Sequence, residues 1–211
     1  MRTVNRLVVP TAGRVTLDGV DVASMDPAIL RRGIGYAIQA VGLFPHMTVA
    51  QNVAVVPELL DWGKADVAAR VDELLALVDL DPARYRARYP RDLSGGEAQR
   101  VGVARAIAAR PHALLMDEPF GAVDAIVRAS LQDELLKIAR ALDTTVLFVT
   151  HDVDEALRLA DRIVVMRDGS IVREGTPVEI LEDPRDDYVR ALFGDDESRA
   201  FRLQRARRAA S

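Results

Sequence analysis

Two adjacent carboxylates follow a short apolar run in the middle of the chain. The run ALLM (113–116) leads directly into Asp117 and Glu118. Ligands of open α/β sheets bind beyond the carboxyl ends of the strands, where a pair of acids can hold a cation and position an attacking water. We interpret Asp117 as a candidate Mg²⁺ ligand and Glu118 as a candidate for polarising the water. Taken alone, the same pair is also typical of a helix N-cap.

A second candidate is the segment LSGGEAQR (93–100), which opens an amphipathic helix. Ser94 is placed to cap that helix, and Gly95 and Gly96 allow an anion to approach backbone N–H groups at the positive end of the helix dipole. An ordinary capped helix with a flexible entry would explain Ser94. Two glycines followed by a polar first turn exceed what capping requires, so the segment indicates phosphate binding.

Two further polar side chains follow other apolar runs. His151 comes directly after TTVLFV (144–149), where an imidazole could donate a hydrogen bond to a phosphate or contact an attacking water. Gln39 follows IGYAI (34–38), where its amide could reach Mg²⁺ or the water, although a lone glutamine is also an ordinary loop residue. If the strands are neighbours, these side chains gather at the edge that carries Asp117 and Glu118.

A sheet whose strands alternate with helices must position these residues. Short β-branched runs occur at RVTLDG, IGYAI, ALLMD, TTVLFV and RIVVM, with amphipathic stretches between the later ones. Runs that are apolar on both faces are typical of buried parallel strands, so the sequence predicts an α/β fold with a covered parallel sheet. The segment 162–175 differs, because Asp168-Gly169 between two apolar runs predicts an antiparallel hairpin.

Three other regions complete the predicted organisation. An apolar stripe at helical spacing between Val67 and Val78 predicts a helical subdomain at about 48–100. At the start, Val4 and Leu7 fall on one face of MRTVNRL, which predicts that the chain opens inside a helix. From Gly194 onward the chain has few apolar residues and a basic end. We therefore expect one domain at 1–193 and a charged tail at 194–211.

Composition narrows the class of protein. The 211 residues carry a formal charge of −4, with 49% hydrophobic and 28% charged residues, which is ordinary for a globular domain and gives no reason to expect nucleic acid as a partner. Cysteine is absent, so a thiolate metal site and a cysteine nucleophile are excluded. The longest apolar runs are too short to span a bilayer, so we expect any membrane role to come through a partner.

Taken together, these residues resemble the ATP-binding cassette ATPases. LSGGEAQR is similar to the family's signature motif, ALLMDEP to its Walker-B strand with the catalytic glutamate, and GAVD (121–124) to its D-loop with Asp124. His151 and Gln39 sit where the family has its switch histidine and Q-loop glutamine. The resemblance extends from about Arg2 to about Phe193. Residues 30–62 and 149–166 are most similar to the ATPase subunits of importers for glycine betaine, choline, carnitine and related osmoprotectants.

The resemblance implies a P-loop NTPase-type core that uses ATP and Mg²⁺. Two cassettes of this family associate head to tail, so the side that contacts nucleotide on the opposite cassette would comprise Ser94, Gly95, Gly96, Glu97 and Asp124. Asp117 and Gln39 would assist Mg²⁺, with Gln39 also linking the site to the membrane subunits. Glu118 would act as general base, and His151 would stabilise charge in the transition state.

The implied partners are a second cassette, a membrane permease and, indirectly, a solute-binding protein. The permease would dock on the surface around Gly42 to Val49 and on the helical block. The protein would then be cytoplasmic and peripheral on the inner face of the plasma membrane. Closing on ATP and reopening after hydrolysis would drive alternating access in the permease.

The chain departs from the family pattern in the part that grips the nucleotide. No G-x-x-x-x-G-K-[ST] occurs among the 211 residues, and the aromatic residue that stacks on adenine has no counterpart. We therefore expect a truncated cassette that lacks the N-terminal strands and P-loop, hydrolyses ATP poorly alone and exposes apolar surface. Three explanations stay open: a start placed at an internal Met or another truncation, a shortened inactive product, and a half-site subunit. Glu97 and Ala125 are smaller departures, where the family often has Gln and Pro.

The leading functional prediction is the ATP-hydrolysing subunit of an osmoprotectant importer. One alternative is a non-catalytic subunit that binds a permease or a complete cassette without turnover. Another is a cassette serving DNA repair or translation. That class usually carries coiled-coil insertions or tandem cassettes, and neither occurs within these 211 residues.

Overall fold

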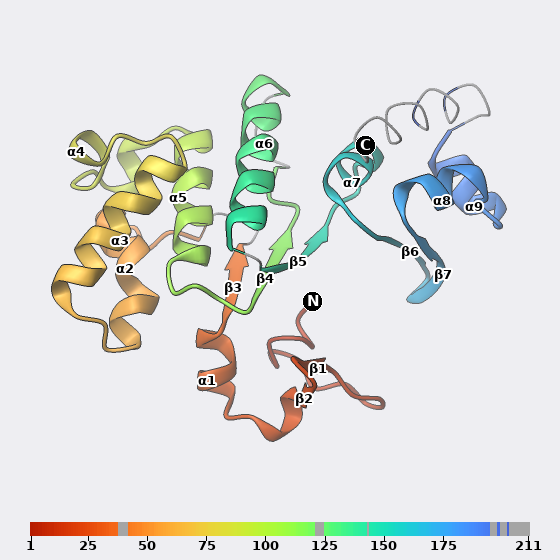
Figure 1. Ribbon diagram of the computed structural model, residues 1–211, viewed down its shortest axis with the longest axis horizontal. Helices are drawn as coiled ribbons and strands as arrows, with labels where there is room; N and C mark the ends of the chain where they lie inside the picture. Colours follow the sequence, from red (N-terminus) through yellow and green to blue (C-terminus); the bar gives the residue numbers. More distant parts are fainter. Residues whose placement is uncertain (38–41, 121–124, 143, 195–197, 199–201, 203–211) are drawn as a thin grey trace. The chain divides into compact units, whose positions relative to one another are not determined.

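The chain folds as two compact units, Met1–Val149 and Thr150–Ser211, each with its own set of elements (Figure 1). The computed structural model describes residues 1–37, 42–120, 125–142, 144–194, 198 and 202. Among these residues, no helix combines the length and apolar character needed to cross a membrane. The predicted boundary between 193 and 194 remains a prediction.

A parallel sheet of three strands forms the centre of the first unit (Figure 1). Its order is β3 (Ile34–Ala37), β4 (Ala113–Asp117) and β5 (Thr145–Val149). The middle strand, β4, is buried along its first four residues. Its last residue, Asp117, is in register with Val149 of β5, so the two strands end at the same level. The prediction of an α/β fold with a parallel sheet is confirmed, whereas the expectation of a fully covered sheet is wrong at β5, where Thr145, Leu147 and Val149 are exposed.

Two long helices accompany this sheet. Helix α5 (Gly95–Ile107) packs its backbone against β3, since a Cβ added at Gly35 would lie 2.3 Å from the carbonyl oxygen of Ala106. Only glycine leaves room for that approach. Helix α6 (Ala125–Leu142) follows β4 and contributes buried leucines to the core.

The region predicted as a helical subdomain contains α2 (Val49–Leu59), α3 (Lys64–Leu77) and α4 (Pro82–Tyr85), and it leads through the 3₁₀ turn η2 (Pro90–Asp92) into α5. Helix α2 begins with a capping box, in which the Thr48 hydroxyl accepts from an amide of the first turn. The predicted apolar stripe is present, because the side chains at these positions of α3 and just after it are buried: Val67, Val71, Leu74, Leu75 and Val78.

The beginning of the chain differs from the prediction in two ways. Residues Met1 to Leu7 form turns closed by bonds such as Val4 N–H to Met1 O (2.9 Å), and Arg6 has a left-handed backbone with φ of 53°. The expected helix is therefore wrong. A segment this short, with Thr and Asn in it and no side-chain cap, does not repay the cost of helix nucleation.

The run RVTLDG is not part of the alternation of parallel strands. It forms β1 (Thr16–Leu17), which pairs antiparallel with β2 (Val20–Asp21) in a separate two-stranded ribbon. Asp18 and Gly19 turn the ribbon with φ of 51° and 80°, as a tight two-residue turn requires. The ribbon leads through the 3₁₀ turn η1 (Val22–Ser24) into α1 (Pro27–Arg32) and β3.

The second unit contains the predicted hairpin. Strands β6 (Ile163–Arg167) and β7 (Ser170–Gly175) pair antiparallel around Asp168 and Gly169, whose φ angles of 50° and 78° fit a tight hairpin turn. The prediction of a hairpin here is confirmed.

Among the described residues up to Gly194, the second unit also contains the helices α7 (Val153–Leu159), α8 (Pro177–Glu182) and α9 (Asp187–Leu192). The hairpin and the last two helices share a buried cluster: Ile163, Val165, Ile180, Leu181, Val189 and Phe193.

Candidate functional site

Ser94 starts helix α5 as the sequence predicts. Its backbone is extended (φ −67°, ψ 164°), and its hydroxyl accepts from the Glu97 amide at 3.3 Å. In return the Glu97 carboxylate accepts from the Ser94 amide at 2.7 Å, which completes a capping box. The serine is exposed, so the cap sits at the surface of the first unit.

The two glycines of the segment form the first turn of α5. Nothing lies within 4 Å of a Cβ added at Gly95, so the space in front of this residue is open. The first-turn amides of Gly95 and Gly96 have no carbonyl partner within their own helix, because helical bonding starts further along. Open space, first-turn donors that the helix itself does not pair and the positive end of the dipole together make this helix end suitable for an anion.

Glu97, predicted to contact nucleotide on the opposite cassette, is bonded to side chains and backbone of its own unit. Its second carboxylate oxygen accepts a hydrogen bond from the Tyr85 hydroxyl at 2.5 Å, in addition to the bond from Ser94. The Tyr85 bond and then the Ser94 bonds lower the pKa of the Glu97 carboxyl, and the same contact raises the pKa of Tyr85. Glu97 therefore ties α4 to the start of α5. The capping-box spacing points to the Ser94 contact, whereas no local pattern indicates Tyr85.

Asp117 and Glu118 lie at the carboxyl end of the buried strand β4, as predicted. Both are partly exposed. The Glu118 amide donates to the Val149 carbonyl of β5 at 2.9 Å, and its backbone is left-handed with φ of 45°. This conformation is uncommon for a residue other than glycine and clusters at functional positions. This bond fixes the backbone of Glu118, which follows Asp117 at the end of β4, to the end of the neighbouring strand β5.

His151 belongs to the second unit, where it is exposed at the start of the segment leading into α7. Its two neighbours are anchored. The Thr150 hydroxyl donates to the Glu155 carboxylate at 2.7 Å, and the Asp152 amide donates to the Thr150 hydroxyl oxygen at 3.0 Å. Asp152 also caps α7 by accepting from the amides of Asp154 and Glu155. The imidazole is thus presented from a backbone fixed on both sides.

The remaining predicted residues, Gln39 and Asp124, lie outside the described residues. The structure therefore brings Asp117 and Glu118 together at one strand end and places Ser94, Gly95 and Glu97 at the start of α5. Ala106, the residue of α5 that packs on β3, lies ~16 Å along the helix axis from Gly95. The helix start and the contact with the sheet are therefore at opposite ends of α5. No cluster of three or more His, Cys, Asp or Glu suited to a metal ion occurs in the described part of the chain.

The surface around Gly42 to Val49 is organised by a side chain that the sequence analysis did not single out. Asn52, fully buried, accepts from the Phe44 amide at 2.8 Å and donates to the carbonyls of Phe44, Met47 and Thr48. The Arg105 guanidinium donates to the Gly42 carbonyl at 2.7 Å, and burial lowers its pKa. Phe44 itself remains 40% exposed at the centre of this loop.

A strand-end acid pair, a glycine-opened capped helix and an anchored histidine are the parts from which nucleotide sites of α/β proteins are built. A model of the family "ABC transporter" matches residues 1–121, which is more than half of the chain. The chain belongs to the ABC transporter family, and the predicted family resemblance is confirmed.

Several curated relatives are similar over 93% of this chain. The glycine betaine/carnitine/choline transport ATP-binding protein OpuCA of Bacillus subtilis (strain 168) is 53% identical, and the match covers 51% of it. The glycine betaine uptake system ATP-binding protein YehX of Escherichia coli (strain K12) is 50% identical, with 64% of it covered. The chain spans about half the length of most of the curated relatives it matches.

Two solved structures are similar in fold. A dimeric post-hydrolysis state of the ATP-binding cassette MJ0796, bound to ADP and Pi, matches with a TM-score of 0.73 and 30% identity, over 83% of this chain and 78% of that one. The structure of cbiO1 from Clostridium perfringens, part of the ABC transporter complex cbiONQ, matches with a TM-score of 0.78, over 87% of this chain and 73% of that one. Its 24% identity supports the shared fold alone.

Proposed function

We propose that this chain is an ATP-binding cassette subunit of an importer and that its start of α5 contacts ATP held by a second cassette. The observation that carries the proposal is the exposed, capped helix start with open space before Gly95. The first-turn amides of an α-helix have no carbonyl partner within that helix. Such a helix end binds phosphate through its amides and its dipole. The related cassette that is dimeric and bound to ADP and Pi supports a pair of cassettes, and the family resemblance implies that the pair is head to tail.

The residues at the strand ends would serve the nucleotide on this chain's own side. Asp117 offers a partly exposed carboxylate that would hold Mg²⁺ together with the phosphates, as this ion is usually held by one or two carboxylates and substrate oxygens. The ion would neutralise charge on those phosphates. Glu118 would orient and deprotonate the attacking water. His151 would contact the terminal phosphate, while Gln39 and Asp124 remain proposed contributors.

We also propose a transport role in which osmoprotectants of the glycine betaine and choline type are the solutes. The printed functions of the relatives at about 50% identity support this, although each is longer than the part matched here. A permease loop would dock beside the half-exposed Phe44, which Asn52 and Arg105 hold in place. The subunit would act at the cytoplasmic face of the membrane, with a solute-binding protein delivering solute on the other side.

The 211 residues contain no G-x-x-x-x-G-K-[ST] motif to cradle the phosphates. We therefore propose that the 211-residue polypeptide does not turn over ATP by itself. In a mixed pair with a complete cassette it would lend its helix start to the partner's nucleotide. A polypeptide that hydrolysed ATP alone at the rate of an isolated complete cassette would contradict this proposal.

A mixed-pair experiment tests the contact. The partner is a complete cassette with an intact phosphate loop, in which the signature serine has been replaced so that its own pairs are inactive. Adding the present chain should restore ATP hydrolysis in the mixture. Gly95→Asp should abolish that rescue because a carboxylate would occupy the place of the phosphate. An acidic residue in the first helical turn does not destabilise the helix.

The control is Gly95→Asn, which has nearly the same shape without the charge. The open space at Gly95 accommodates either side chain. Equal rescue by the Asp and Asn variants, or rescue by neither the parent chain nor its variants, would refute the proposed contact.

A further inference from the structure

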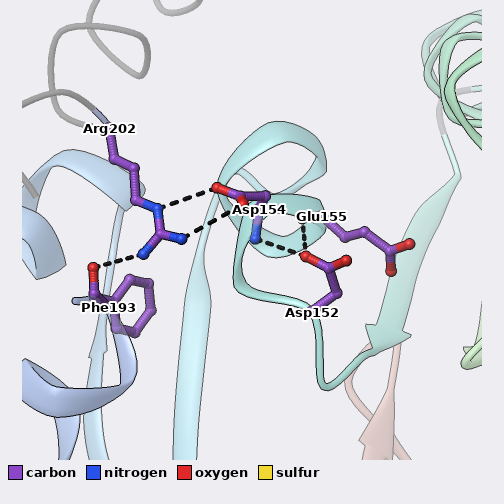
Figure 2. Close-up of polar contacts among 5 residues, drawn as sticks. All are labelled: Asp152, Asp154, Glu155, Phe193 and Arg202. Atoms are coloured by element: carbon purple, nitrogen blue, oxygen red, sulfur yellow. Dashed lines mark hydrogen bonds and ion pairs between the residues drawn. The ribbon is translucent and has the colours of Figure 1, made fainter. Parts of the chain in front are cut away.

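Arg202 connects the segment beyond α9 with the start of α7 (Figure 2). Its Nη1 donates to the Phe193 carbonyl at 2.6 Å, and its Nε and Nη2 donate to the two carboxylate oxygens of Asp154 at 3.1 and 3.4 Å. The guanidinium thus engages a carbonyl at the end of α9 and, with two parallel bonds, an acid in the first turn of α7. This fork geometry is specific to arginine.

Gly194, just after the end of α9, has a backbone conformation that favours glycine. Its φ of 93° is open to glycine and strained for other residues. A Cβ at this position would also lie 3.0 Å from the Ser198 Cβ and 3.5 Å from the Arg202 Nη1. Arg202 is well covered, with 23% of its side chain exposed, whereas the Asp154 side chain is 61% exposed.

Asp154 is part of the hydrogen-bond network that holds His151. Figure 2 shows Asp152 accepting from the Asp154 and Glu155 amides, at 2.9 and 3.2 Å. Glu155 in turn accepts from the hydroxyl of Thr150, the residue before His151. Asp154 is thus bonded to Asp152 on one side of His151, and its chain neighbour Glu155 is bonded to Thr150 on the other side.

We propose that Arg202 is a positioning residue for His151. It fixes the first turn of α7 against the end of α9 and so sets where the imidazole is presented. The functional meaning of that positioning rests on the proposed ATPase role of His151. The positioning itself is a property of the second unit and is testable without nucleotide.

The experiment compares the full chain with the variants Arg202→Ala, Arg202→Lys and Asp154→Asn. Arg190→Ala is the control, since it removes one arginine from an exposed position of α9. Amide exchange at Asp154, Glu155 and Ala156 is measured by NMR, together with the imidazole signal of His151. The signals of His46 and His112, which belong to the first unit, serve as internal references.

We expect Arg202→Ala and Asp154→Asn to accelerate exchange at these amides about two- to fivefold, the range that an ion pair of this exposure contributes. Both should move the His151 imidazole signal, and Arg202→Lys should recover part of the change. Arg190→Ala should alter neither. Raising the salt to about 1 M, where screening acts within ~3 Å, should accelerate exchange in the parent chain and leave Arg202→Ala unchanged.

Two results would overturn the proposal. Unchanged exchange in both Arg202→Ala and Asp154→Asn would mean that the contact does not hold α7. Faster exchange with an unmoved His151 signal would reduce Arg202 to a structural contact. Neither the amide exchange nor the His151 signal is measured with ATP. The positioning role can therefore be confirmed if the mixed-pair experiment fails, and it can be refuted if the mixed-pair experiment succeeds.

Discussion

Arg70 of α3 offers a quantitative test of how the helical block supports the end of α5. Its side chain is 5% exposed and donates to the carbonyls of Ile107 and Ala108, both at 3.1 Å, just where α5 ends. A third bond goes to Glu73 at 2.7 Å, whose side chain is 58% exposed. We predict that Arg70→Met strongly destabilises the first unit.

The magnitude follows from the two carbonyls. Methionine keeps most of the aliphatic packing but leaves both buried oxygens without a donor, at ~1–3 kcal/mol each. The variant recovers part of this because no guanidinium has to be desolvated. The exposed Glu73 contact adds little. We therefore expect a loss of about 2–4 kcal/mol in the free energy of unfolding.

The assay is urea unfolding of the full chain followed by tryptophan fluorescence. Trp62 is the sole tryptophan of the sequence and lies between α2 and α3, so its signal reports on the block that contains Arg70. With an m-value of ~2 kcal/mol/M, a 3 kcal/mol loss moves the midpoint down by about 1.5 M.

Arg86→Met provides the matched control. Arg86 pairs with Asp72 at 3.1 Å, but the two side chains are 43% and 42% exposed, so its loss should cost no more than ~1 kcal/mol. If Arg70→Met cost no more than Arg86→Met, the reasoning from buried carbonyls would be refuted.

Three further outcomes are expected. Gly35→Ala should destabilise the first unit by about 2 kcal/mol or more in the same urea assay, because its Cβ would lie 2.3 Å from the backbone oxygen of Ala106; a loss below ~0.5 kcal/mol would contradict the close packing. The folded pKa of Glu97 is lowered, so its contribution is complete above the unfolded value of about 4.3 and disappears as the pH falls through the folded pKa. Unfolding measured from pH 7 to 3 should show this acid loss, and Glu97→Gln should flatten it, whereas parallel curves would disprove the linkage. Gly169→Ala should weaken the β6–β7 hairpin by about 1 kcal/mol because φ is 78° there, seen as faster amide exchange in both strands; unchanged exchange would count against that explanation.

Part of the site was predictable because its signals are local. The acids Asp117 and Glu118 follow a run that is apolar on both faces, and the structure places that run as the buried central strand β4. Ser94 and Glu97 have capping-box spacing, and the box is formed. In each case the residues that interact or define the element lie within a few positions of one another, so composition and spacing describe them adequately.

The same local reasoning failed at the beginning of the chain. The apolar spacing of MRTVNRL suggested a helix, but the segment forms turns. The β-branched run RVTLDG predicts a parallel strand, but Asp18-Gly19 is the same kind of dipeptide as Asp168-Gly169, and both form hairpins. A turn dipeptide of this kind therefore outweighs a short β-branched run.

Local pattern was therefore sufficient for the family, the α/β class, the strand-end acids, the capped helix and the second hairpin. Tertiary structure alone decided which distant groups meet. The Tyr85 hydroxyl donates to Glu97, Arg70 donates to the carbonyls at the end of α5, and Arg202 donates to Asp154. Partners that lie 12 to 48 positions apart meet only after intervening elements have packed, and no periodicity of helix or strand records such a meeting. These long-range contacts determine how rigidly the chemistry predicted from the sequence is held.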